Sequence, residues 1–364
     1  MKILMYDNGQ PFDIDTPYTS SLGGSESSVL LLSKGLEILG NSVVICNSRK
    51  GSTSSQNNLM ICHNNSFHSL VDESDIIICN RSFPQGLETY IGKKPIYYYA
   101  HDAYDQQLIT NWMYNYNLIN ALSGILCVSE WQKHTFTDYF NIPNDLHHKF
   151  QVVGNSIDIS LSYGYTKKYK NRLIFAGIPY KGIDVLKKVF DSICVKSERD
   201  DLDLHVFSSM SLYGNKDADR EYEQQFKQLN NTKNIHLHDS VNLNELTSWL
   251  GSSSVYLSPS TYHETFGMLL VQAQAVGCIP VTMNNGAVNE VIQNNQTGYI
   301  SKYPNIQNSE GLDDFVSLVC DVLKKDDTYK MELQARDWAK QWDYIKTANK
   351  VNDILNSKQE IVSK

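Results

Sequence analysis

Residues 260–286 read STYHETFGMLLVQAQAVGCIPVTMNNG and place one carboxylate, that of Glu264, just before an apolar helical run. The first N–H groups of a helix lack partners within the helix and carry partial positive charge. Glu264 could therefore accept hydrogen bonds from ligand hydroxyls, or it could cap those N–H groups, and the segment leaves both interpretations open. Gln272 follows Glu264 by eight residues, or about two helical turns, so we expect it near the same face.

Two further segments combine glycine with a turn before a helical pattern. Gly23 and Gly24 in SSLGGSESSVLLLSKGL would let a ligand approach the backbone at a helix start that suits an anion, with Ser25 as the expected N-cap. Lys181 in FAGIPYKGIDVL could hold a phosphate as a mobile point charge. A tight turn without a ligand explains Gly23 and Gly24 as well, and an ordinary surface lysine explains Lys181. Neither segment matches GxGxxG or the loop ending in Gly-Lys-Ser/Thr, which disfavours dinucleotide binding and nucleoside triphosphate hydrolysis.

The elements that must position these residues are short apolar runs that alternate with helical patterns. Such strands predict parallel sheets covered on both faces, so the expected fold class is α/β with two doubly wound, Rossmann-like domains. The expected strands are residues 2–6, 42–46, 75–79, 95–100 and 124–128 in a first set, and 172–176, 202–207, 234–238, 254–258 and 278–283 in a second. Ligands bind beyond the carboxyl ends of such strands, so we expect the site in a cleft where the loops of the two sheets converge.

The domain boundaries follow from where the pattern starts again. We expect an N-terminal domain over residues 1–155 and a C-terminal domain over 156–344, with a hinge near Gly154 and Asn155. A C-terminal helix of about residues 345–364 is expected to complete the first domain. Residues 49–58, RKGSTSSQNN, are expected to form an exposed loop.

Composition excludes some classes of protein. The 364 residues include 41% hydrophobic and 20% charged ones, as in an ordinary soluble globular protein. A net charge of −8 disfavours nucleic acid as a partner. The seven cysteines include no CxxC pair and favour buried thiols in a reducing compartment. No stretch suits a signal peptide or a transmembrane segment, so we expect a cytoplasmic protein, with peripheral membrane contact left open.

An ordered set of motifs resembles the retaining glycosyltransferases of family 4, which have the GT-B fold. The set comprises Gly23-Gly24, His101 in YYYAHDAY, VSEWQK (128–133), VVGNSID (152–158), the Lys181-Gly182 turn and HETFGMLLVQAQAVGCIPVTMNNGAVNEVI (263–292). Each motif is weak by itself, but the same order over most of the chain is specific.

The resemblance implies a role for each matched position in the first domain. Gly23 and Gly24 would lie against the phosphates and the transferred sugar of the donor. His101 would lie near the reacting carbon, and with ten histidines in the chain this role depends on the resemblance.

In the second domain, the resemblance implies that Lys181 contacts the donor's diphosphate and that Glu264 hydrogen-bonds its sugar. The N–H groups of Thr265, Phe266 and Gly267, expected to begin the helix, would meet the phosphates.

Two positions depart from the family pattern. Gln272 stands where a second Glu usually accepts hydrogen bonds from the ribose hydroxyls, and an amide keeps one acceptor oxygen but loses the charge. Ile178 stands where an Arg commonly joins the lysine on the diphosphate. Donor affinity is therefore more in question than the fold.

The activity expected is transfer of a hexose or N-acetylhexosamine, with retention, from a uridine or guanosine diphosphate sugar to a glycan, lipid-linked or protein-linked acceptor. A lysine and helix N–H groups can stabilise the charge on the leaving group, so we expect no metal and no cofactor. The Asp-x-Asp triplets at 13–15 and 201–203 are attributed to chance among 40 acidic residues.

Other classes of function stay open at this point. A catalytically inactive relative that binds a saccharide or a partner would fit Gln272 and the absent Arg. A nicotinamide-dependent oxidoreductase would fit the doubly wound pattern and is disfavoured by the missing glycine fingerprint. No motif indicates the pyridoxal lysine of a phosphorylase.

Overall fold

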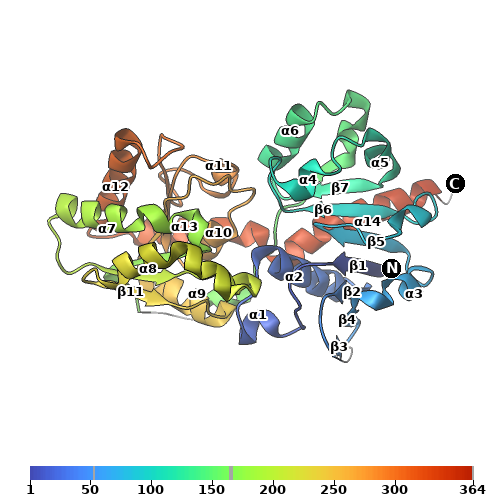
Figure 1. Ribbon diagram of the computed structural model, residues 1–364, viewed down its shortest axis with the longest axis horizontal. Coiled ribbons are helices and arrows are strands. Elements are labelled where there is room, and N and C mark those ends of the chain that lie inside the picture. Colours follow the sequence, from blue (N-terminus) through green and yellow to red (C-terminus); the bar gives the residue numbers. More distant parts are fainter. Residues whose placement is uncertain (52–53, 164–166, 363–364) are drawn as a thin grey trace. The chain divides into compact units, whose positions relative to one another are not determined.

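The protein consists of two compact units, as seen in a computed structural model that describes residues 1–51, 54–163 and 167–362 (Figure 1). The first unit contains Met1–Thr16, Gly23–Ile157 and Trp342–Lys364, and the second contains Pro17–Leu22 and Asp158–Gln341. Each unit is built on its own largely parallel sheet, so the predicted α/β class with two doubly wound domains is confirmed. The short segment Pro17–Leu22 belongs to the second unit, which no sequence pattern indicated.

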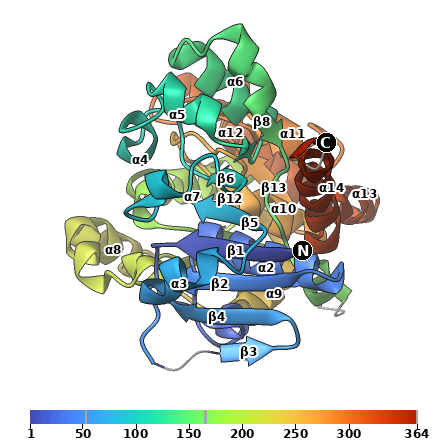
Figure 2. The ribbon, with the colours of Figure 1, turned by 90° about the vertical axis from the view of Figure 1, so that its right-hand side faces the viewer.

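The sheet of the first unit has eight strands among the described residues, in the order β3-β4-β2-β1-β5-β6-β7-β8. Figure 2 shows β3, β4, β2, β1, β5 and β6 side by side in this order. The strands are β1 (Lys2–Asp7), β2 (Ser42–Asn47), β3 (Ser54–Gln56), β4 (Leu59–His63), β5 (Ile76–Asn80), β6 (Ile96–Ala100), β7 (Gly124–Cys127) and β8 (Phe150–Val152). All neighbours pair in parallel except β3, which runs antiparallel to β4. Central strands such as β5 and β6 are buried along their whole length, which explains their apolar sequences.

The expectation of a loop over residues 49–58 was partly wrong, because β3 lies within it. Asn57 adopts φ +52, in the left-handed region that Asn tolerates, and so permits the tight turn from β3 into β4. The strand has no apolar run to reveal it, since it is a short edge strand of Ser and Gln. Residues 52 and 53 lie outside the described residues.

The C-terminal helix α14 packs against α2 and thereby completes the first unit (Figure 1). A methyl group on Gly35 of α2 would lie 2.5 Å from Ala348 Cβ and 2.7 Å from Tyr344 O, so the two helices approach as closely as glycine allows. The helices of this unit are α2 (Gly24–Ile38), α3 (Phe67–Val71), α4 (Gln107–Thr110), α5 (Tyr116–Ala121), α6 (Glu130–Tyr139) and α14 (Tyr344–Val362), and α1 (Thr16–Thr19) spans the boundary between the units.

The sheet of the second unit has six parallel strands among the described residues, in the order β11-β10-β9-β12-β13-β14. The strands are β9 (Tyr169–Ala176), β10 (Asp203–Phe207), β11 (Ile235–His238), β12 (Ser253–Ser258), β13 (Ile279–Thr282) and β14 (Tyr299–Ile300). The helices are α7 (Ile183–Ser197), α8 (Glu223–Asn230), α9 (Leu243–Ser252), α10 (Met268–Ala275), α11 (Val288–Val291), α12 (Ser309–Leu323) and α13 (Tyr329–Ala339). Because β9 and β12 are neighbours, the loops that follow them leave the same edge of the sheet. In the part of the chain that the structure describes, no helix is both long and apolar enough to cross a membrane.

Candidate functional site

Lys181 and Glu264 form an ion pair at the carboxyl edge of the second sheet. Lys181 ends a 3-10 turn after β9, and Glu264 lies in the loop after β12. Lys181 Nζ donates to both carboxylate oxygens, at 2.7 Å and 2.9 Å. The lysine side chain is 28% exposed and the glutamate side chain 13%, so a ligand can reach both. Burial acts to lower the pKa of Lys181, but the charge of Glu264 and its hydrogen bonds outweigh this effect and raise the pKa, so the ammonium stays charged.

The backbone of Glu264 is fixed by the loop after β13. Glu264 and Gly286 form a parallel β-bridge, and Ala287 N donates to Glu264 O at 2.7 Å. Gly286 has φ +76, and a Cβ at this position would lie 2.3 Å from Glu264 O. Both the backbone conformation and the close approach therefore require glycine, and together they hold the carboxylate in place.

The helix after Glu264 begins at Met268, so the expectation that Thr265, Phe266 and Gly267 begin it was wrong. Gly267 is the N-cap residue and has φ +89, a left-handed conformation that breaks the helix at this point. Thr265 and Phe266 lie in the preceding loop. Since the Glu264 carboxylate binds Lys181, the alternative in which it caps the helix is disfavoured.

The two departures from the family pattern occupy different environments. Gln272 is half-buried in α10, one turn after the helix begins. Ile178 is buried, with 2% of its surface exposed, and directly precedes the turn that carries Lys181. An apolar buried residue supplies no cation there, which agrees with the departure seen in the sequence.

At the edge of the first sheet, α2 begins at Gly24 with Gly23 as its N-cap residue, so the expectation of Ser25 as the N-cap was wrong. Ser25 Oγ instead donates to Glu26 Oε2 at 2.8 Å. Glu26 is buried in the first turn of the helix, where the partial positive charge of the helix start stabilises a carboxylate. This carboxylate opposes an anionic ligand at Gly23 and Gly24, whose contact with donor phosphates stays a prediction.

Arg81 offsets part of this negative charge. Its guanidinium binds Asp102 through two hydrogen bonds of 2.8 Å and 2.7 Å, and its Nη1 lies 3.9 Å from Glu26 Oε1. A second buried carboxylate, Asp7 at the end of β1, accepts hydrogen bonds from Asn80 and from the backbone of Gly9. Burial and the charge of Glu26 raise the pKa of Asp7 to about 6.

His101 directly follows β6 in the first unit, as the sequence predicted for its place after that strand. Its ring centroid lies 4.2 Å from that of Tyr99. Burial lowers the pKa of His101 to about 3, and the charge of Arg81 acts in the same direction, so the imidazole is neutral at pH 7. His101 belongs to a different unit from Lys181 and Glu264, and its role beside the reacting carbon stays a prediction.

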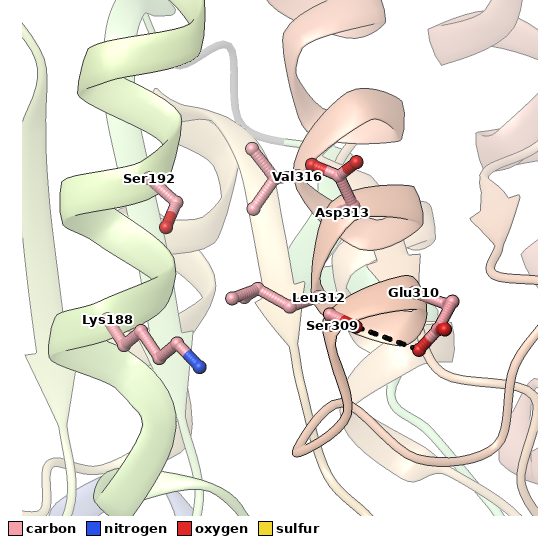
Figure 3. A pocket seen from close by; sticks show the side chains of 7 residues that line it. All are labelled: Lys188, Ser192, Ser309, Glu310, Leu312, Asp313 and Val316. Atoms are coloured by element: carbon pink, nitrogen blue, oxygen red, sulfur yellow. Dashed lines mark hydrogen bonds between the residues drawn. The ribbon is translucent and has the colours of Figure 1, made fainter.

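A cavity of about 350 Å³ in the second unit lies between α7 and α12, away from these residues (Figure 3). Its lining comprises Lys188, Ser192, Ser309, Glu310, Leu312, Asp313 and Val316. None of the predicted site residues lines it, and its mixed charges indicate no particular ligand.

Sequence reasoning missed three tyrosines beside the ion pair, Tyr180, Tyr213 and Tyr262. Tyr180 and Tyr262 act electrostatically on Lys181, and Tyr213 and Tyr262 act on Tyr180. A signal was present for two of them, because Tyr180 precedes Lys181 and Tyr262 precedes Glu264 by two residues. The third follows β10, and only the fold brings it to the same edge.

Comparisons with known proteins find similarity within the second unit. Residues 167–321 match the family model of glycosyl transferases group 1. A segment of 133 residues is 33% identical to D-inositol 3-phosphate glycosyltransferase of Arthrobacter sp. (strain FB24), and it covers 36% of this chain and 30% of that protein. The match thus spans about a third of the curated relative.

Two solved structures resemble the whole chain. HepE of Anabaena, in complex with UDP and glucose, superposes with a TM-score of 0.72 at 16% identity, over 98% of this chain and 100% of that chain. Sucrose-phosphate synthase of Thermosynechococcus elongatus gives a TM-score of 0.75 at 12% identity, over the full length of both chains. The predicted GT-B fold is confirmed, and residues 167–321 are similar to the glycosyl transferases group 1 family.

Proposed function

We propose that this protein is a retaining glycosyltransferase that moves a sugar from a nucleoside diphosphate donor to a hydroxyl acceptor without a metal ion. The observation that carries the proposal is the Lys181–Glu264 ion pair, which lies within the segment that matches the glycosyl transferases group 1 model, at the carboxyl edge of its sheet. A partly exposed cation and a carboxylate at such an edge can bind the phosphate and the hydroxyls of one ligand.

In this proposal, each residue has a distinct chemical task. Glu264 accepts hydrogen bonds from hydroxyls of the donor sugar, and Gly286 keeps its backbone in place. Lys181 stabilises the negative charge that develops on the diphosphate as the bond to the anomeric carbon breaks. The start of α10, opened by Gly267, adds partial positive charge on the same side. His101 provides a neutral imidazole near the reacting carbon.

The bonds formed and broken in the proposed reaction balance. The acceptor oxygen forms a new bond to the anomeric carbon, the electron pair of the broken bond stays on the diphosphate, and the proton of the acceptor hydroxyl is released to solvent. A uridine or guanosine diphosphate sugar is the preferred donor, which the complex of HepE with UDP and glucose supports by its ligand. The related enzyme named for D-inositol 3-phosphate suggests phosphorylated polyols as one acceptor class, beside glycans, lipid-linked and protein-linked sugars.

The test is release of nucleoside diphosphate from uridine, guanosine and adenosine diphosphate sugars, with and without a panel of sugar and inositol phosphate acceptors. We expect one donor to be turned over by the wild type, and Glu264→Gln to lower kcat/KM by about a hundredfold. Glu221→Gln, at an exposed position of the same unit, is the matched control. Equal turnover by wild type and Glu264→Gln would refute the assignment of Glu264, and the anomeric configuration of the product by NMR tests retention.

Metal independence is tested in the same assay. Turnover is expected to be unchanged by a chelator, because Lys181 and the helix start supply the positive charge. Loss of turnover that returns with added Mg²⁺ or Mn²⁺ would contradict this part of the proposal alone.

A further inference from the structure

Two tyrosines lie beside the Lys181–Glu264 pair, one from each of two loops at the carboxyl edge of the second sheet. Tyr180 follows β9 and Tyr262 follows β12. The rings of Tyr180 and Tyr262 lie with their centroids 5.3 Å apart. Since Tyr180 adjoins Lys181 and Tyr262 precedes Glu264 by two residues, this pair of rings flanks the ion pair.

The hydroxyl of Tyr180 is a hydrogen-bond donor at neutral pH. Burial raises its pKa, with Tyr213 acting in the same direction and Lys181 opposing, so it stays protonated. The charges of Lys181 and Glu264 both act on this hydroxyl, and Tyr180 and Tyr262 in turn act on Lys181. The two tyrosines therefore lie at the same edge of the sheet as the lysine that the proposed function places on the diphosphate.

The charges at this edge are too few to neutralise a diphosphate, so uncharged hydrogen-bond donors can add to its binding. Lys181 and Glu264 together are neutral, whereas a nucleoside diphosphate sugar is an anion. Ile178, at the end of β9, is buried and apolar and adds no positive charge. A neutral hydroxyl that donates to a charged phosphate oxygen forms a strong hydrogen bond and requires no counter-charge.

We propose that the hydroxyls of Tyr180 and Tyr262 hold the donor's diphosphate alongside Lys181, as uncharged hydrogen-bond donors. The inference rests on the proposed function, because it assigns further contacts to the same ligand. Tyr180 is 42% exposed and Tyr262 is half-buried, so a ligand can reach both rings.

The experiment removes single oxygen atoms. Tyr180→Phe and Tyr262→Phe keep the ring and lose only the hydroxyl, and binding is measured by calorimetry with inorganic pyrophosphate, UDP, GDP and uridine. We expect each variant to bind pyrophosphate and the preferred diphosphate about tenfold or more weakly than the wild type, and uridine equally well. Tyr329→Phe, at an exposed position in α13, is the matched control and should bind all four probes as the wild type does.

The outcomes separate this inference from the proposed function. If the wild type binds no nucleoside diphosphate and no pyrophosphate, the proposed function fails and this inference with it. If the wild type binds and both Phe variants bind equally well, the tyrosine inference alone is overturned. A loss in the Phe variants that is equal for UDP and uridine would also overturn it, because the hydroxyls would then contact the nucleoside and not the diphosphate. Thermal unfolding of each variant confirms that a change in binding does not come from misfolding.

Discussion

The carboxyl edges of the two sheets both carry charged residues, but in opposite settings. In the first unit, Asp7 and Glu26 are each 1% exposed and are held by fixed hydrogen-bond partners. In the second unit, Lys181 and Glu264 bind each other and remain partly exposed. A buried charge without its partners is costly, so the first group must keep its contacts, whereas the second can exchange them for a ligand.

From this difference we expect the two edges to have different tasks. The first edge combines buried carboxylates with a helix start, and these carboxylates are held by hydrogen bonds within the protein. The second edge combines a cation, a carboxylate and phenol hydroxyls that a ligand can reach. Ligand chemistry is therefore expected to depend more on the second edge, and stability and its pH dependence more on the first.

The largest effect should come from removing the cation at the second edge. Lys181→Met is expected to lower kcat/KM by about a thousandfold, since it removes charge stabilisation of the leaving group. The measurement is nucleoside diphosphate release under subsaturating donor. Lys187→Met, at an exposed position on α7, should leave the rate unchanged. A loss of less than about threefold in Lys181→Met would contradict the expectation that ligand chemistry depends more on the second edge.

A substitution at Gly286, which contacts the backbone of Glu264, should lower stability. Gly286→Ala forces φ +76 on a residue with a Cβ and brings that Cβ within 2.3 Å of Glu264 O, so we expect a loss of about 3 kcal/mol in urea unfolding. Gly40→Ala separates the two causes, because Gly40 also has a positive φ, +86, but has open space around it. It should cost about 1 kcal/mol. Equal losses in both variants would mean that the contact with Glu264 contributes nothing.

At the first edge, Asp7 should make stability depend on pH. Its pKa of about 6 lies above the ordinary value of 3.8, so the folded state binds the proton more tightly than the unfolded state. The associated stability is fully present below about pH 4 and is lost as the pH rises through 6, by about 3 kcal/mol in total.

Asp7→Asn tests this sign. The variant carries no proton at this position, so its free energy of unfolding should fall by about 3 kcal/mol less than that of the wild type between pH 4 and pH 7. The measurement is urea unfolding at several pH values, followed by the difference between the two curves. Parallel curves would show that Asp7 does not titrate in this range.

The smallest effect should come from an ion pair that is exposed and belongs to neither edge. Lys187 Nζ lies 2.6 Å from Asp191 Oδ2 one turn along α7, and both side chains are well exposed. Lys187→Ala is expected to change the free energy of unfolding by less than about 0.5 kcal/mol, because solvent screens such pairs. A loss above 1 kcal/mol would show that short distance alone, without burial, stabilises this protein.

Much of the fold was accessible from the sequence, because buried parallel strands leave continuous apolar runs. β5, β6 and β12 were found within a residue or two of their ends. β14 has only two residues and β3 is polar, so neither produces a run long enough to detect. These two strands needed the pairing partners that only the folded chain supplies.

The candidate site was predictable in its residues but not in its contacts. Lys181 and Glu264 were each singled out by a turn or a helix start, while their ion pair joins residues 83 apart and leaves no local pattern. The helix start was misplaced because Gly267 was expected to be helical. Its positive φ is not helical, so the helix begins only at Met268. Backbone conformation at a glycine is set by the surrounding structure as well as by the sequence.

The packing of α14 on α2 has a consequence for how the protein is made. The first unit is discontinuous, since Trp342–Lys364 returns to it after the whole of the second unit. On a ribosome that adds 5–20 residues per second, the chain from Asp158 to Gln341 takes roughly 10–40 s to synthesise. Throughout that interval, the side of α2 around Gly35 has no helix to cover it. The nascent chain thus exposes an apolar face that chaperones can bind, and it can fold its second unit before it closes its first.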